Sequence, residues 1–145
     1  MVKPRVFLDA NIFVAATKSP QGGSRLILNL AKEKKIEIVT VRHALGEAER
    51  NIELKFGRGY LLDYYRLLIE LSPTIQSIKH ATIKDILALG RVVPRKDIPI
   101  TLGALHSKCA FLITLDKKDL LGNKNLIGFP FKIITPGEFI QKYLI

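Results

Sequence analysis

Two short runs of apolar residues in this chain each lead directly to an aspartate, and this pattern constrains the fold more than any other feature. Residues 6–8, Val-Phe-Leu, precede Asp9, and residues 110–115, Ala-Phe-Leu-Ile-Thr-Leu, precede Asp116. Strands that are apolar on both faces are typical of parallel sheets covered by helices on both sides. Polar chemistry in such proteins lies beyond the carboxyl ends of the strands. The sequence therefore predicts an α/β domain with both aspartates at one edge of its sheet, although Asp9 could simply cap a turn after a core strand.

Helix and strand signals alternate along the rest of the chain. Further strands are predicted at 36–41, 74–79 and 131–134, and helices at 25–35, 43–56, 60–71, 82–89, 98–108 and from Pro136 onward, with a short helical turn after Asn11. The expected N-caps are Ser24, Thr82 (in a capping box with Asp85), Asp97 and Thr135. Right-handed crossovers make the strands parallel. We expect a three-layer α/β/α domain with a central parallel sheet of four or five strands. No linker or repeat interrupts the sequence, so we expect residues 1–145 to form a single domain.

The composition is that of a folded globular protein. Of the 145 residues, 48% are hydrophobic and 25% are charged. No apolar run approaches the ~20 residues that a membrane helix needs. The chain starts too close to its first predicted strand to hold a signal peptide. The single cysteine, Cys109, excludes an internal disulfide, fits the reducing cytoplasm and is expected in the core. The sequence thus predicts a cytoplasmic protein with no membrane segment.

The charge balance is strongly basic. Lysine and arginine number 23 against 13 acids, for a formal net charge of +10. This excess favours an anionic partner, most simply a nucleic acid, although a lysine-rich solvated surface would give the same charge. Tyr60, Tyr64 and Tyr65 lie at helical spacing and fit packing, with stacking on bases left open. No Cys/His metal cluster, Walker loop or dinucleotide fingerprint is present in the sequence.

Four acids that are far apart in sequence are expected at one rim of the sheet. Asp9 and Asp116 follow strands directly, and helices begin at the edge where the preceding strands end. Glu47 lies in the first turns after the second predicted strand, and Asp97 begins the helix that leads to the strand before Asp116. Carboxylates gathered in this way raise each other's pKa unless a cation lies among them. Topology alone therefore predicts an acidic site.

The chemistry of such a site follows from its ligands. Carboxylate oxygens suit Mg²⁺ or Mn²⁺ and not Zn²⁺. These ions can activate a water and stabilise the charge on a phosphodiester under attack. An acidic site in a basic protein therefore indicates metal-dependent cleavage of a nucleic acid.

Each acid also has a simpler explanation. Asp97 could be only a helix cap, and Glu47 could be only a solvated helix residue, because the apolar stripe of its helix leaves Glu49 nearer the core-facing side. Asp119 could cap a turn or supply a fifth acid. His43, His80 and His106 show no metal-ligand spacing.

With these residues assembled, the chain resembles the PIN domain family, the nuclease domain of many prokaryotic toxins and RNA-processing factors. Four motifs appear in order at 7–11 (Phe-Leu-Asp-Ala-Asn), 45–47 (Leu-Gly-Glu), 97–104 (beginning Asp-Ile-Pro-Ile) and 114–116 (Thr-Leu-Asp). The stretch from Asp119 to Leu121 fits the family's tail. Together the motifs span nearly the whole chain.

The resemblance implies roles for six residues, of which the first four would bind the metal and the last two would orient them or their water: Asp9, Glu47, Asp97, Asp116, Asn11 and Thr114. It favours Glu47 over Glu49. The chain departs from the usual pattern by an extra lysine before Asp119, and by Gly103 and His106 in place of alanines. None of these departures is a proposed ligand.

The resulting expectation is a Mg²⁺- or Mn²⁺-dependent endoribonuclease that leaves 5′-phosphate and 3′-hydroxyl ends. Candidate phosphate contacts near the rim are Arg91, Arg95, Lys96, Lys117 and Lys118. A toxin-like member of the family would form a homodimer and bind a small antitoxin. The main alternative is a non-catalytic RNA-binding or scaffold PIN-like protein. A phosphatase with a nucleophilic aspartate is a weaker one, because it would need a second aspartate where this chain has Asn11.

Overall fold

The centre of the molecule is a sheet of five short parallel strands, in the order β3-β2-β1-β4-β5. The computed structural model describes residues 3–143. The strands are β1 (Arg5–Leu8), β2 (Glu37–Thr40), β3 (Thr74–Ile75), β4 (Phe111–Ile113) and β5 (Lys132–Ile134). The helices are α1 (Ala10–Lys18), α2 (Gly23–Lys32), α3 (Arg42–Phe56), α4 (Arg58–Leu71), α5 (Ile83–Gly90), α6 (Ile98–His106) and α7 (Pro136–Tyr143). The predicted α/β class with a parallel sheet is confirmed.

Strand β1 forms the middle of this sheet because its residues are apolar on both faces. Phe7 is paired in register with Val39 of β2 on one side and with Leu112 of β4 on the other. The three residues Val6, Phe7 and Leu8 are all completely buried. Asp9 and the residues that follow β4 therefore emerge side by side at the carboxyl edge.

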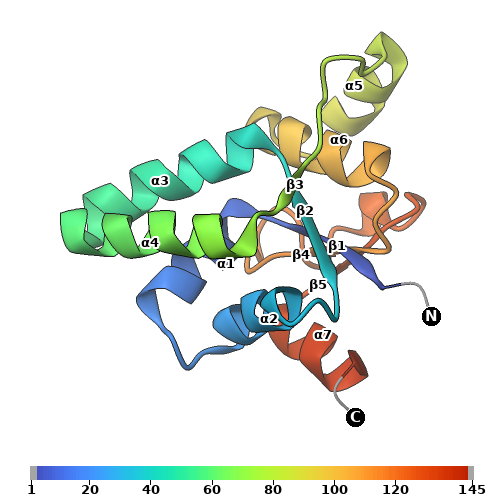
Figure 1. Cartoon of the computed structure of the whole chain (residues 1–145). Helices are drawn as coiled ribbons and strands as arrows, with labels where there is room; N and C mark the ends of the chain where they lie inside the picture. The colour runs from blue at the N-terminus through green and yellow to red at the C-terminus, as the bar shows by residue number, and fades with distance from the viewer. Residues whose placement is uncertain (1–2, 144–145) are drawn as a thin grey trace.

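Helices cover both faces of the sheet (Figure 1). Helices α2 and α7 pack against each other below the sheet in this view, and α6 lies above it. Helices α3 and α4 form a hairpin that projects to one side, where α3 also packs against α1. None of the helices in residues 3–143 is long and apolar enough to cross a membrane.

Gly103 explains how closely α6 approaches the sheet. A Cβ atom at this position would lie 2.5 Å from Cγ1 of Val41 and 2.7 Å from Cε2 of Phe7. These distances are too short for any side chain, so glycine is required where the helix crosses the sheet. Its departure from the alanine-rich family pattern thus has a packing cause.

Several predicted boundaries need correction. Ser24 is buried inside α2 and does not cap it, because the helix already begins at Gly23 after the extended residue Gly22. The short turn expected after Asn11 is the nine-residue helix α1. The predicted strand at 74–79 pairs with β2 only at Thr74 and Ile75.

Other local predictions are confirmed. Thr82 caps α5 by accepting a hydrogen bond from the backbone N–H of Asp85 at 3.1 Å. The Asp85 carboxylate does not close the predicted box, and instead lies 3.5 Å from Nε2 of His106 in α6. Cys109 is a buried free thiol in the main core, as expected.

Candidate active site

Asp9 is held at the junction of β1 and α1. The residue is only 6% exposed, and Oδ1 of its carboxylate accepts a hydrogen bond from the Ala10 N–H at 2.7 Å. Oδ2 accepts from the Thr114 hydroxyl at 2.8 Å and from Nδ2 of Asn11 at 3.3 Å. Asp9 thus caps α1 and is also fixed from the next strand.

Thr114 and Asn11 tie the ends of β1 and β4 together. The buried Thr114 hydroxyl donates to Asp9 and accepts from Nδ2 of Asn11 at 3.1 Å and from the Asp116 N–H at 3.0 Å. Oδ1 of Asn11 accepts from the Leu115 N–H at 3.0 Å. Every lone pair and proton of the Thr114 hydroxyl is used, so the two strand ends cannot shift independently.

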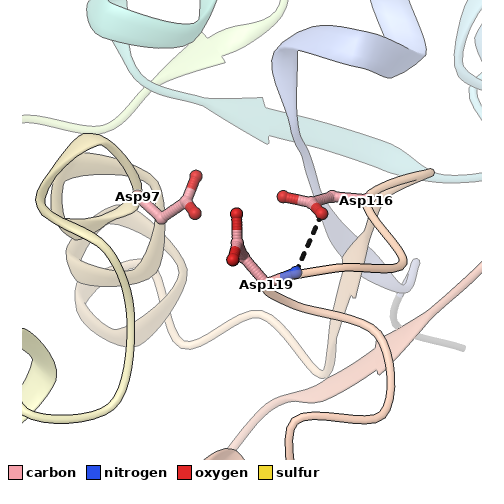
Figure 2. Close-up of side chains that lie close together, drawn as sticks. All are labelled: Asp97, Asp116 and Asp119. Carbon is pink, nitrogen blue, oxygen red and sulfur yellow. Dashed lines mark hydrogen bonds between the residues drawn. The ribbon is translucent and has the colours of Figure 1, made fainter.

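Three carboxylates come close together beside this network (Figure 2). Asp97, Asp116 and Asp119 each offer an oxygen within 4.8 Å of the others. Oδ1 of Asp116 accepts the backbone N–H groups of Lys118 and Asp119, both at 3.0 Å, which folds the turn that brings Asp119 back toward Asp97. We call Asp97, Asp116 and Asp119 the acidic cluster.

Asp97 stands at the N-cap position of α6 but does not cap it with its side chain. The 3-10 turn Arg95–Asp97 leads into the helix, so the residue has φ −95° and ψ −3°, not the extended geometry that capping needs. Its Oδ2 is buried and has no hydrogen-bond partner among residues 3–143. The prediction that Asp97 is a capping residue is therefore wrong. A buried polar atom left without a partner is costly, so this oxygen is free to accept a hydrogen bond or to contact a cation.

Burial and mutual repulsion shift the pKa of two acids upward. Burial is the main cause that raises the pKa of Asp97 to about 6, with Asp9, Asp116 and Asp119 adding to it and Lys96 opposing it. Burial also raises the pKa of Asp9, against the hydrogen bonds from Thr114 and Ala10. The charge of Asp116 contributes to both shifts, so Asp9 lies within electrostatic range of the acidic cluster although it falls outside that close group.

Glu47 lies at the periphery of this site. It is half-buried on α3, and its Oε2 is 3.9 Å from Nε2 of His43. Its charge contributes to the raised pKa of Asp9. Glu49 is exposed and accepts a hydrogen bond from the Tyr65 hydroxyl of α4. The suggestion from the apolar stripe that Glu49 is nearer the core is wrong, because the Glu49 side of α3 faces its hairpin partner.

The structure thus brings the six predicted residues to one edge of the sheet, but not all of them into the close group of carboxylates. Asp97 and Asp116 are in the close group, Asp9 is joined to it through Thr114 and Asn11, and Glu47 is farther out. The close third acid is Asp119, which the sequence left open. Its signal is the three-residue spacing from Asp116, since an aspartate readily accepts backbone N–H groups two and three residues on. A cavity of about 580 Å³ between Leu120 and Glu138 contains none of these acids.

The acidic cluster fits a divalent cation. Its donors are hard carboxylate oxygens, which Mg²⁺ and Mn²⁺ prefer. The unpartnered Oδ2 of Asp97 and the raised pKa of this carboxyl are what a cation would relieve. Nζ of Lys96 lies 3.3 Å from Oδ2 of Asp119 and balances only part of this charge.

Comparison with known proteins agrees with this architecture. The family model described as PIN domain matches residues 5–118, and so ends one residue before Asp119. A structure of VapBC2 from Rickettsia felis bound to a DNA fragment from their promoter superposes with a TM-score of 0.63 and 17% identity, covering 90% of this chain and 98% of that one. VapC20 from Mycobacterium tuberculosis, a sarcin-ricin loop cleaving toxin, superposes with a TM-score of 0.55 and 15% identity, covering 86% of this chain and 95% of that one. No curated protein sequence matches the chain.

Proposed function

Because this chain belongs to the PIN domain family, we propose that it is a metal-dependent ribonuclease that cuts RNA internally. The observation that carries the proposal is the acidic cluster, with three carboxylates within 4.8 Å and one buried oxygen left without a partner. A purely structural cluster of this kind would be a net cost, because like charges repel and a buried polar atom is unsatisfied. The cost is explained if the cluster exists to bind a cation.

In this proposal Asp97, Asp116 and Asp119 hold Mg²⁺ or Mn²⁺, and Asp9 and Glu47 complete the acidic surroundings. When bound, such an ion activates a water and offsets negative charge on the phosphate under attack. The water oxygen would form a new bond to phosphorus and give up a proton as the bond to the 3′ oxygen breaks, and the 3′ oxygen would take up a proton from solvent, which leaves 5′-phosphate and 3′-hydroxyl ends. The ion identity is part of the proposal and follows from the oxygen donors.

The residues of the chain position these acids. Thr114 donates to Asp9 and accepts the N–H of Asp116, so one hydroxyl sets the separation of two acids from different strands. Asn11 holds both Asp9 and Thr114. Because these side chains are already ordered, binding a cation does not carry the entropic cost of fixing them in place.

Basic residues beside the acids can hold the RNA backbone. Lys96 already lies against Asp119, and its side chain is 64% exposed, so it can reach a phosphate while remaining next to the acidic cluster. The remaining exposed candidates are Arg91, Arg95, Lys117 and Lys118. The overall charge of +10 attracts a polyanion to this rim.

The structural neighbours support a toxin–antitoxin role. The Rickettsia felis neighbour is a VapBC2 complex, and the Mycobacterium tuberculosis neighbour is a toxin. We therefore include in the proposal a small antitoxin as partner and a homodimer as the assembly.

The proposal also includes a cytoplasmic location and a single nuclease domain. The buried free thiol of Cys109 fits a reducing, cytoplasmic setting. The main core extends from Val6 to Phe139, which supports one nuclease domain.

The test is cleavage of a mixed-sequence single-stranded RNA with Mg²⁺, Mn²⁺ or EDTA. Asp116→Asn is the informative variant, because the amide keeps the Oδ1 acceptor that receives the Lys118 and Asp119 N–H groups while removing the charge. Asp63→Asn is the matched control, since Asp63 is exposed on α4 and pairs with Arg66 of the same helix. We expect cutting with metal, none with EDTA, and a loss of about 100-fold or more in Asp116→Asn only.

Two results would contradict the proposal. Cutting that persists in EDTA, or that is equal in both variants, would mean that the acidic cluster is not the active centre. Absence of both cutting and metal binding in folded wild-type protein would favour the scaffold alternative.

A further inference from the structure

A second binding feature lies next to the acidic site, between α1 and the end of α3. It is an open cavity of about 360 Å³, within the range of about 300–1,000 Å³ common for small-ligand sites. Asn11 and Leu115 line it, and these two residues are also joined by the hydrogen bond that closes the β1–β4 end. The cavity, which we call the Lys18 cavity, is therefore continuous with the residues around Asp9.

Two lysines give the Lys18 cavity a positive charge. Lys18 and Lys55 both line it, both are exposed, and neither forms an ion pair with an acid in the described part of the chain. Lys96, in contrast, is paired with Asp119. The two cavity lysines are thus available to an anionic ligand.

Lys18 is held in place by aromatic rings. Its Nζ lies 4.9 Å from the ring centre of Phe56 and 4.7 Å from that of Tyr60, and it donates to the Tyr60 hydroxyl at 3.4 Å. Cation–π contacts of this kind restrain a long flexible side chain without neutralising it. The ammonium is therefore restrained at the cavity, so less side-chain conformational entropy is lost when a ligand binds.

The remaining walls are apolar, with one amide. Val14, Phe56 and Leu115 form the apolar part, and Leu115 is 43% exposed. Asn51 offers a carbonyl acceptor and an amide donor. Cations, flat apolar surface and one amide are the set of contacts that a nucleotide needs for its phosphate, its base face and its base edge.

We propose that the Lys18 cavity binds a nucleotide of the RNA strand that flanks the bond being cut, with its phosphate at Lys18 and Lys55 and its base against Phe56 and Leu115. This inference rests on the proposed ribonuclease function. It also gives the substrate a path: the strand enters at the Lys18 cavity, crosses the acidic site at Asp9, and leaves on the side of Lys96. An unpaired strand fits this path, because a base must be free to lie against the apolar wall.

The test measures binding in EDTA, where metal-dependent cutting is off. The probe is a fluorescein-labelled single-stranded RNA of about 12 nucleotides, followed by anisotropy between about 50 and about 200 mM KCl. The variant is Lys18→Gln/Lys55→Gln. The matched control is Lys79→Gln/Lys84→Gln, which removes the same charge next to and within α5, on another side of the molecule (Figure 1).

We expect the cavity variant to bind about tenfold more weakly and its slope of log K against log salt to fall by about 0.7, which corresponds to one phosphate that is no longer neutralised. The control should change affinity by no more than about twofold. Lys18→Arg keeps the charge and the aromatic contacts, so it should bind like the wild type. An unchanged thermal midpoint in each variant shows that folding is intact.

The outcomes separate this inference from the proposed function. If the wild-type protein cuts RNA but the cavity and control variants bind RNA equally well, only the proposal that the Lys18 cavity binds a nucleotide is overturned. Wild-type protein that binds RNA through the two lysines but never cuts it would overturn the ribonuclease and leave the cavity standing. If an oligoglutamate peptide binds as tightly as the RNA, and the cavity variant loses this binding too, the ligand is an acidic peptide and not RNA.

Discussion

Replacing Asp97 by asparagine should stabilise the metal-free protein at neutral pH. Asp97 is 6% exposed, and the pKa of its carboxyl is raised from the ordinary value of 3.8 to about 6. The folded state therefore binds this proton more tightly than the unfolded state does. The contribution to the free energy of unfolding is favourable below the unfolded pKa and is lost as pH rises through about 6. About two pKa units correspond to about 3 kcal/mol, which is the cost of keeping Asp97 ionised at pH 7.5.

The assay is denaturant unfolding in EDTA at about pH 4 and about pH 7.5. Asparagine is neutral at both values, and its amide can donate to the carboxylates of Asp116 and Asp119, which lie within 4.8 Å. Asp97→Asn should exceed the wild type by about 3 kcal/mol at the higher pH and by less than about 1 kcal/mol at the lower one. The exposed Asp63→Asn should change the free energy of unfolding by less than about 0.5 kcal/mol at either pH.

Adding metal should reverse the order of stability. Mn²⁺ at about 1,000 times its dissociation constant stabilises a protein that binds it by about 4.1 kcal/mol, which exceeds the expected advantage of the variant, and only the wild type should gain this. A variant that is no more stable than the wild type at pH 7.5 in EDTA would refute the reasoning, because the carboxylate would then be compensated in the metal-free protein. Equal stabilisation of both proteins by Mn²⁺ would show that Asp97 is not a ligand.

Three further changes test the packing and the assignment of the acids. Asp9→Asn should lower the free energy of unfolding by about 1–3 kcal/mol, because the new amide faces existing donors, whereas Asp116→Asn should leave this free energy unchanged. Urea unfolding of the two variants measures the difference, and equal losses would contradict the hydrogen-bond assignment. Gly103→Ala should cost at least about 1–3 kcal/mol by overpacking, and a thermal midpoint unchanged from wild type would mean that α6 can move away from the sheet. Glu47→Gln should slow RNA cleavage while Glu49→Gln leaves it unchanged, and the opposite order of rates would restore Glu49 as the helix acid.

The sheet and two of its acids follow from local sequence because the cause is local. Three successive apolar residues before Asp9 require cover on both faces, and this alone indicates a parallel strand. The same logic places Asp116 after β4. The choice between Glu47 and Glu49 is not local, since it depends on which side of α3 the second helix of its hairpin covers. An apolar stripe marks a buried face but does not say whether a helix or the sheet buries it.

The Lys18 cavity cannot be predicted from the sequence for a related reason. Lys18 ends α1, whereas the rings that hold it come from the end of α3 and the start of α4. No spacing in the chain connects these positions. They meet only because α1 packs against both helices of the hairpin. Basic residues next to the acidic motifs can be found in the sequence, but those brought there by packing cannot.

Asp97 shows why a broken local rule carries information about function. An aspartate before a helix with proline in its first turn has every local reason to cap that helix. In the structure it makes no capping bond, buries an oxygen without a partner and faces two other carboxylates. Packing alone gives no compensation for a buried oxygen without a partner beside two like charges. A cation among these acids would convert the same features into a binding site, because the unpartnered oxygen and the excess negative charge are what it needs.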